Sequence, residues 1–283
     1  MGAGVERNSS NGQMKTNMGD IVEAVVLSTP NYLHHLEVFL PSFLQHFGSE
    51  IQLTVVHSGG SPPVVPSGVE LVISERPLGC GAARELARPR TRAPWVLYTD
   101  ADVTFPVGFY QTLLDEITRA EALCLDGVQL DFKPRDATRW GFFEFLLDRM
   151  VILNRSALAD DGDWWDRDAS VDEWTGNETM VPVSCMQGFG MLLRREAVDA
   201  IGGFDRRLDS GEDRDIAARL IKAGGRICMT SKCFVLHSYD FAFSRILRRK
   251  SWHGEFSALT SAIHPDLFPG SIVSCLRMMS RGA

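Results

Sequence analysis

Residues 95–106 read WVLYTDADVTFP, an apolar run of strand-forming residues that ends in two aspartates separated by one alanine. In open α/β sheets, ligands bind beyond the carboxyl ends of the strands. Two carboxylates at this spacing can hold a divalent cation together with a phosphorylated ligand. We therefore expect Asp100 and Asp102 to mark the functional edge of a sheet.

The chain before this stretch alternates between short β-branched runs and helical patterns. Residues 21–28 (IVEAVVLS) and 51–57 (IQLTVVH) are typical of buried strands, and between them leucines and phenylalanines recur at helical spacing up to Gly48. This order predicts βαβ units. We expect an α/β fold with a mostly parallel, Rossmann-like sheet flanked by helices.

The chain after Pro106 is less regular, and its organisation is predicted segment by segment. We expect helices at 106–120, 140–155, 194–200 and 212–223, strands at 122–132, 226–229 and 232–237, and two strand-like runs around MQGFGMLL. The polar start favours a disordered tail over 1–19. We therefore expect a single domain over 20–240 and a helical extension over 241–283.

Composition excludes several classes of protein. A content of 45% hydrophobic and 23% charged residues is that of an ordinary globular chain, and the net charge of −7 argues against nucleic-acid binding. No run approaches the roughly 18 apolar residues of a membrane span. Six scattered cysteines and a start without a hydrophobic signal core favour a reduced, cytoplasmic protein.

Residue patterns alone leave the chemistry open. Asp100, Asp102 and Thr104 also match the nucleophile motif of haloacid-dehalogenase-like phosphatases, in which the first aspartate attacks phosphorus. The acids that begin the helix at 212 could cap it or present a general base. His237, after an apolar run, fits either a structural hydrogen bond or a metal site shared with carboxylates.

Taken in order, segments between residues 21 and 237 resemble the GT-A-fold nucleotide-sugar glycosyltransferases of family two. The segments are VVLSTPNYLHHLEVFLPSF (25–43), VVHSGGS (55–61), RPLGCGAAREL (76–86), YTDADV (98–103), CMQGFG…GGRI (185–227) and VLH (235–237). The long segment at 185–227, which contains the Glu-Asp motif, is the most specific of them. The resemblance argues against the phosphatase, because the nucleophile strand normally opens the core domain of such phosphatases, whereas here about 80 residues of predicted βαβ chain precede the Asp-x-Asp motif.

The resemblance implies transfer of a sugar from a nucleoside-diphosphate sugar, expected to be a UDP-sugar, to a small-molecule or glycan acceptor. It implies that Mn²⁺ or Mg²⁺ is held by Asp102 and His237, with Asp100 sharing the metal or lying against the ribose. Asp213 would be the general base of an inverting reaction, with Glu212 as the fallback. Donor-side residues would be Thr29, Pro30, His57, Arg84, Asp100 and Ala101, and acceptor-side residues would be Gln187 and Gly188.

Two positions depart from the family pattern, and two other functions stay open. His57 with Ser58 replaces the aspartate that reads the base, and Glu85 replaces the asparagine that usually follows Arg84. A sugar-nucleotide-binding module without catalysis and a nucleotidyltransferase are the alternatives that share the sheet.

Two charged segments stand outside the resemblance. The acidic loop at 160–174 carries Trp164 and Trp165 and is either a solvated surface loop or an acceptor site for a partly apolar, cationic ligand. The basic stretch at 245–250 is either a solvated helix face or a segment that reaches the diphosphate or an anionic membrane surface.

Overall fold

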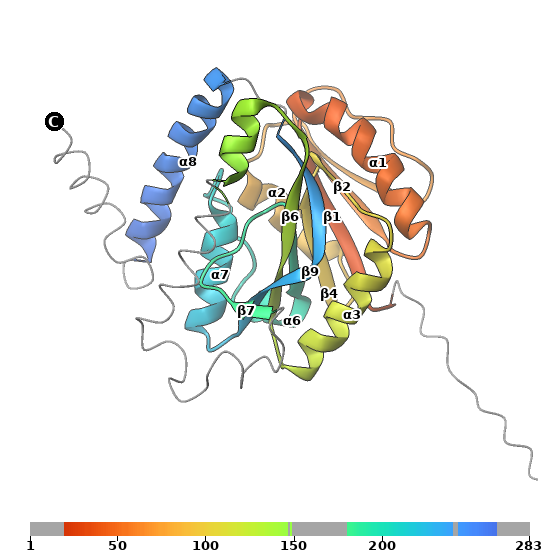
Figure 1. The fold of residues 1–283 in the computed structure, drawn as a ribbon, viewed down its shortest axis with the longest axis vertical. Coiled ribbons are helices and arrows are strands. Elements are labelled where there is room, and N and C mark those ends of the chain that lie inside the picture. The colour runs from red at the N-terminus through yellow and green to blue at the C-terminus, as the bar shows by residue number, and fades with distance from the viewer. Residues whose placement is uncertain (1–19, 147, 149–179, 240–242, 265–283) are drawn as a thin grey trace, which may run out of the picture.

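The computed structural model describes residues 20–146, 148, 180–239 and 243–264 (Figure 1). Its strands form one sheet in the order β3-β2-β1-β4-β8-β6-β9-β5, and β7 pairs with β9. In the view of Figure 1, α1 and α3 lie on one side of the strands, and α7 and α8 lie on the other. The predicted α/β fold class is confirmed.

The first half of the sheet is parallel and follows the predicted βαβ order. Its strands are β1 (Val22–Ser28), β2 (Leu53–Ser58), β3 (Glu70–Ser74) and β4 (Trp95–Asp100), and every pairing among them is parallel. They are connected through α1 (Leu33–Phe47) and α2 (Cys80–Ala87), with short 3-10 turns at Pro30–Tyr32 and Arg88–Arg90. All six residues of β2 are buried, as expected for a strand covered on both faces.

The second half of the sheet is mixed in direction. It contains β5 (Val103–Thr104), β6 (Gly127–Ala137), β7 (Met180–Pro182), β8 (Met191–Arg194) and β9 (Ile227–Tyr239). β8 runs antiparallel to β4 and β6, β6 runs parallel to β9, and β5 and β7 run antiparallel to β9.

Three predicted strands are wrong in their bounds. The strand predicted at 122–132 begins only at Gly127, because α3 (Phe109–Ala122) continues to Ala122, and it runs on to Ala137 through its pairing with β9. The strands predicted at 226–229 and 232–237 are the single strand β9. The polar residues that seemed to separate them lie where the register shifts, between the pairs Gln129–Met229 and Asp131–Phe234.

The remaining helices are α6 (Arg195–Ala200), α7 (Glu212–Lys222) and α8 (Phe243–Ile263). Residues 139–146 are also helical, as predicted for the start of 140–155, and the rest of that prediction lies mostly outside the described residues. Within the described part of the chain, no helix combines the length and apolarity needed to cross a bilayer.

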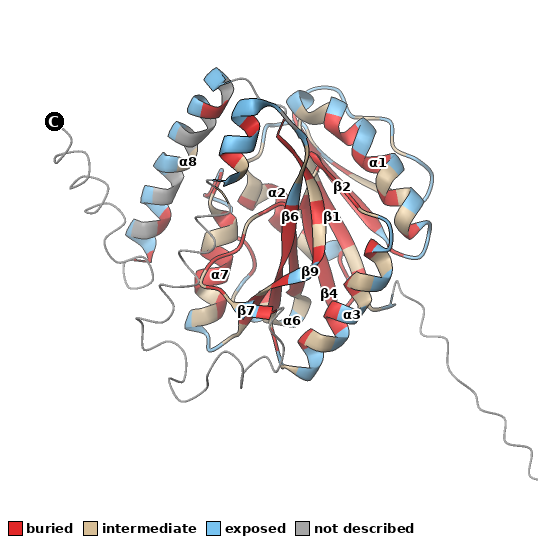
Figure 2. Ribbon diagram, in the orientation of Figure 1, coloured by how far each residue is buried: buried red, intermediate tan, exposed pale blue. Residues whose placement is uncertain are grey.

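A cluster of phenylalanine rings fixes the segment that follows β4. Phe105 packs against Phe39, Phe43 and Phe47 with ring centroids 5.2–6.0 Å apart. Its backbone N–H also donates to Ser42 Oγ at 3.1 Å. Burying each ring contributes about 1.5–3 kcal/mol. The turn that carries Asp102 is thereby held on the buried core (red in Figure 2).

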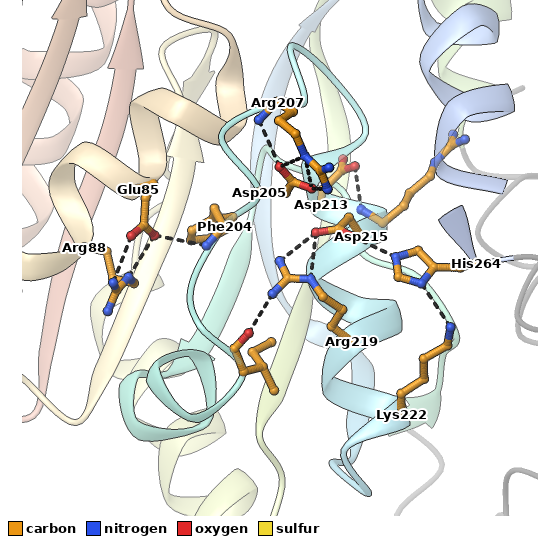
Figure 3. A network of polar contacts seen from close by, with 12 residues as sticks. Glu85, Arg88, Phe204, Asp205, Arg207, Asp213, Asp215, Arg219, Lys222 and His264 are labelled. Carbon is orange, nitrogen blue, oxygen red and sulfur yellow. Dashed lines mark hydrogen bonds and ion pairs between the residues drawn. The ribbon is translucent and has the colours of Figure 1, made fainter. Parts of the chain in front are cut away.

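His264, the last described residue, is hydrogen-bonded to two side chains of α7 (Figure 3). His264 Nε2 lies 2.8 Å from Asp215 Oδ1, and Lys222 Nζ lies 3.1 Å from His264 Nδ1. Because an ammonium can only donate, Nδ1 accepts and Nε2 donates to Asp215. The other oxygen of Asp215, Oδ2, accepts from Arg219 at 2.9 and 2.6 Å.

Asp215→Ala should destabilise the protein by roughly 3 kcal/mol, because removing one partner of a buried charge pair leaves the other uncompensated. The Asp215 side chain is 2% exposed, whereas Arg207 in the Arg207–Asp205 pair is 81% exposed. Arg207→Ala is therefore the matched control. Urea unfolding should show a lower midpoint for Asp215→Ala and an unchanged one for Arg207→Ala; equal midpoints would contradict this account.

Candidate active site

Asp102 and His237 meet where β5 pairs with β9. The register places Val103 opposite His237, and the Asp102 carbonyl accepts from Ser238 N at 2.9 Å. Consequently His237 Nε2 lies 3.5 Å from Asp102 Oδ1. Two residues that are far apart in sequence, one just after β4 and one near the carboxyl end of β9, therefore form a pair.

This pair fits a divalent cation. Both side chains are 6% exposed. Within the described residues, neither Asp102 Oδ1 nor His237 Nδ1 has a hydrogen-bond partner, which is uncommon for buried polar atoms. The described residues contain no group of three or more His, Cys, Asp or Glu side chains arranged for a metal. The pair would thus supply only part of a coordination shell, and ligand oxygens and water would supply the rest.

Arg84 connects the acids of two motifs. Its side chain is 1% exposed, and Nη2 donates to Asp100 Oδ1 at 3.2 Å and to the Gly188 carbonyl at 3.1 Å. Nη1 forms an ion pair with Glu212. A buried guanidinium thus holds the end of β4, the turn before β8 and the start of α7 together.

The position of Arg84 is set by the start of α2. The amides of Cys80 and Gly81 donate to the carbonyls of Asp209 and Leu208 at 3.1 and 3.0 Å. These contacts satisfy helix-terminal donors that would otherwise lack partners. The loop before α7 therefore caps the helix whose Arg84 pairs with α7.

Glu212 and Asp213 are adjacent but differ in access. Glu212 is buried in the ion pair with Arg84, whereas Asp213 is partly exposed. Asp213 Oδ2 accepts from Gly188 N at 3.0 Å, and Oδ1 accepts from Arg214 N at 2.8 Å. Asp213 is thus the member of the pair that solvent or a ligand can reach.

Asp100 lies within electrostatic reach of the other groups. Loss of hydration raises the pKa of Asp100; Arg84 opposes this, and the charges of Asp102 and Asp213 add to it, while His237 lowers it. The net result is a raised pKa. The predicted residues Arg84, Asp100, Asp102, Asp213 and His237 therefore share one region of the fold.

The other predicted residues are placed differently. Thr29 and Pro30 follow β1, and Ala101 is buried in the turn after β4. The His57 side chain is 0% exposed, and its Nδ1 lies 3.2 Å from Ser28 Oγ. Direct contact of His57 with a base is therefore not supported, because no surface of the residue is accessible. Trp164 and Trp165 lie outside the described residues.

Gln129 is a site residue that sequence reasoning missed. It is completely buried, and its Oε1 accepts from Gln187 N at 2.7 Å while Nε2 donates to the Gly190 carbonyl at 3.2 Å. It thereby holds the loop that contains Gly188. A polar amide between the apolar Val128 and Leu130 was the signal that could have indicated this role.

Glu85 bonds α2 to the turn after α6 (Figure 3). Burial acts to raise its pKa, but hydrogen bonds from Arg88, at 2.8 Å each, and from Phe204 N, at 3.0 Å, outweigh burial and lower it. The departure at this position therefore has a structural role. Although Glu85 is next to Arg84 in the sequence, its hydrogen bonds are to Arg88 and Phe204, which do not belong to the site.

Gly188→Ala should destabilise the protein by about 1–3 kcal/mol, because an added Cβ would lie 2.5 Å from Arg84 Nη2. Gly254→Ala is the matched control: its Cβ would meet nothing within 4 Å, and alanine should stabilise the helix by up to about 1 kcal/mol. Thermal unfolding should move the two midpoints in opposite directions. A Gly188→Ala midpoint at or above that of wild type would show that Arg84 is not closely packed there.

The chain resembles known glycosyltransferases in sequence. No protein-family model matches it. A pre-mycofactocin glycosyltransferase of Mycobacterium tuberculosis, found in two strains, is 25% identical over an alignment of 231 residues, and the match covers 79% of this chain and 45% of that protein. The chain thus spans just under half the length of the curated relatives it matches.

Solved structures match over most of the chain. GalNAc-T7 with UDP, GalNAc and Mn²⁺ matches 78% of this chain and 44% of its own, with a TM-score of 0.56 and 15% identity. S. aureus TarS covers 77% of this chain and 36% of its own, with a TM-score of 0.53 and 14% identity. These are GT-A glycosyltransferases. The chain has a GT-A fold.

A third GT-A structure has a nucleotide-sugar bound. The mannosyltransferase PcManGT from Pyrobaculum calidifontis, in complex with GDP-Man and Mn²⁺, covers 76% of this chain and 56% of its own, with a TM-score of 0.50 and 19% identity. The structural likeness to these proteins, at 14–19% sequence identity, shows the shared GT-A fold alone. Donor, metal and acceptor must be argued from this chain's own residues.

Proposed function

We propose that this chain transfers a sugar from a nucleoside-diphosphate sugar, expected to be a UDP-sugar, to the nucleophile of a small-molecule or glycan acceptor. One observation carries the proposal: the Asp102–His237 pair and the accessible Asp213 lie in one region, organised by buried Arg84. The names of the similar proteins, which include glycosyltransferases with UDP or GDP-Man, support this reading.

Asp102 and His237 would hold a divalent cation, Mn²⁺ or Mg²⁺, and Asp100 would share it or lie against the ribose. Their buried, unpartnered Oδ1 and Nδ1 atoms support this assignment. When bound, the cation neutralises charge on the diphosphate leaving group. Mn²⁺ in two of the similar structures is consistent with it.

Asp213 would take the proton of the acceptor nucleophile, which leads to inversion. Glu212 is less suited, because it is buried and its charge is balanced by Arg84. Hydrogen bonding to Gly188 N orients the Asp213 carboxylate. A positioned carboxylate of this kind typically contributes 10²–10⁴ in rate. Gln187 and Gly188, beside it, would border the acceptor.

The alternatives have less support. A phosphatase has no use for Asp213 and its Gly188 contact, and the similar proteins are glycosyltransferases. A binding module without catalysis has no need for an accessible acid in the same region as the Asp102–His237 pair. The cytoplasmic setting stays a prediction, as does the role of Trp164 and Trp165.

A thermal-shift screen of nucleotide-sugars tests the proposal and names the donor. With Mn²⁺ present, a nucleoside-diphosphate sugar at 100 times its dissociation constant should stabilise the protein by about 2.7 kcal/mol. Nucleoside triphosphates and sugar phosphates serve as controls for the nucleotidyltransferase and phosphatase readings. Stabilisation by a sugar phosphate or a triphosphate, with none by any nucleotide-sugar, would overturn the proposal.

A further inference from the structure

Two helices expose large apolar side chains beside each other. In the helix at 139–146, four large apolar side chains are 43–53% exposed. In α8, Phe243 and Leu247 are 46% and 55% exposed. The rings of Trp140 and Phe243 lie 4.7 Å apart, which joins the two sets. We call the combined set the aromatic surface. Its members are Trp140, Phe142, Phe143, Leu146, Phe243 and Leu247.

The exposed apolar side chains are not the ones that pack the helix at 139–146 onto the sheet. The helix at 139–146 is anchored to the sheet by other residues: Phe145 packs on Phe132 and Tyr239, with ring centroids 5.5 and 5.8 Å apart. The exposed side chains lie outside those contacts. Contiguous exposed apolar residues of this size indicate an interaction site.

Positive charge is concentrated next to the aromatic surface. Residues 243–250 read FSRILRRK and contain four basic residues and no acidic one, in a chain whose net charge is −7. The described side chains of Arg139 and Arg248 are exposed. The same short stretch of an otherwise acidic chain therefore carries four basic residues together with the exposed Phe243 and Leu247.

We propose that the aromatic surface and the basic residues of α8 dock onto a lipid bilayer that contains anionic lipids. Tryptophan and phenylalanine rings are suited to the boundary between headgroups and acyl chains. Clusters of four or more Lys and Arg residues on such a helix bind anionic headgroups. Charge complementarity therefore selects the bilayer over an uncharged partner.

The docking surface lies close to the candidate active site. The Tyr239 ring contacts both Phe145 and His237, with ring centroids 5.8 and 4.6 Å apart. One layer of rings therefore separates the helix at 139–146 from the Asp102–His237 pair. Docking would bring the site near an acceptor presented at the bilayer surface, although the docking itself does not depend on the proposed sugar transfer.

Vesicle flotation of the full chain tests the inference without any substrate. The vesicles contain phosphatidylcholine alone or with about 30% phosphatidylglycerol. Wild type should float with the anionic vesicles, much less with the neutral ones, and less as salt rises. No flotation with anionic vesicles, or equal binding to both kinds, would overturn the proposal.

Three variants locate the contact. Arg248→Glu should weaken binding at least about fivefold, because each basic residue near an anionic surface contributes about that factor. The double variant Phe243→Asn, Leu247→Asn should lose most binding. Val64→Asn removes an apolar side chain that is 96% exposed elsewhere and should bind like wild type.

Light scattering and thermal unfolding complete the experiment. Arg248→Glu should unfold at the wild-type temperature because its side chain is exposed, so its weaker binding cannot reflect misfolding. Binding that all three variants leave unchanged would overturn the proposal. The proposal would also be overturned if wild type formed a dimer that did not bind vesicles and if the double variant were monomeric. The aromatic surface would then join two copies of the chain.

Discussion

Asp102→Asn is expected to lower sugar transfer by roughly a hundredfold to a thousandfold, and excess EDTA should do the same to the wild type. A bound cation contributes several kcal/mol to stabilising charge in the transition state, and each 1.4 kcal/mol is tenfold in rate. Asparagine is the preferred substitution because Asp102 is 6% exposed and alanine would leave a cavity. Turnover should be measured at several Mn²⁺ concentrations.

The matched control is Asp115→Asn, an exposed aspartate on α3 that bonds to Gln111. It should have wild-type turnover and the wild-type response to Mn²⁺. Near-normal transfer by Asp102→Asn, or by wild type in EDTA, would mean that the Asp102–His237 pair does not hold a required metal.

Asp213→Asn is expected to lower kcat by roughly two to four powers of ten while the KM for the donor changes little. The amide can still accept from Gly188 N but cannot take a proton. Because Asp213 is partly exposed, the thermal midpoint should stay near that of wild type. Steady-state kinetics with varied donor and acceptor separate the two effects.

Glu212→Gln distinguishes the two adjacent acids. It removes a charge that is paired with buried Arg84, so the main effect should be lower stability, by about 3 kcal/mol or more. If Asp213→Asn instead kept the wild-type rate, the base would be Glu212, or the reaction would be a retaining one that needs no enzymic base.

Local patterns were enough to predict the first half of the sheet. The strands at β1, β2 and β4 are continuous β-branched or apolar runs, and α1 ends at Gly48, whose φ of 57° suits glycine. The second half depended on pairing between distant segments. The bulge that makes β9 one strand is set by its partner β6, and no pattern within residues 226–237 reveals it.

The acidic motifs were predictable from the sequence, and the resemblance implied a role for each, but the burial that distinguishes Glu212 from Asp213 was not predictable. Asp100, Asp102 and Asp213 stand out because of their places after a strand or at a helix start. Arg84 becomes the connecting residue only because α2 is capped by the loop at 208–209 and points the guanidinium inward. Burial of this kind, like that of His57, depends on tertiary packing that a single sequence does not display.

The most direct measurement identifies the phosphorus-containing product of the reaction. Phosphorus NMR can monitor this product when the protein is given a nucleotide-sugar that stabilises it. Sugar transfer breaks the bond between the sugar and the diphosphate, so the account predicts an intact nucleoside diphosphate that forms in wild type and is nearly absent with Asp213→Asn. Release of a nucleoside monophosphate with a sugar phosphate, or of inorganic phosphate, would contradict it.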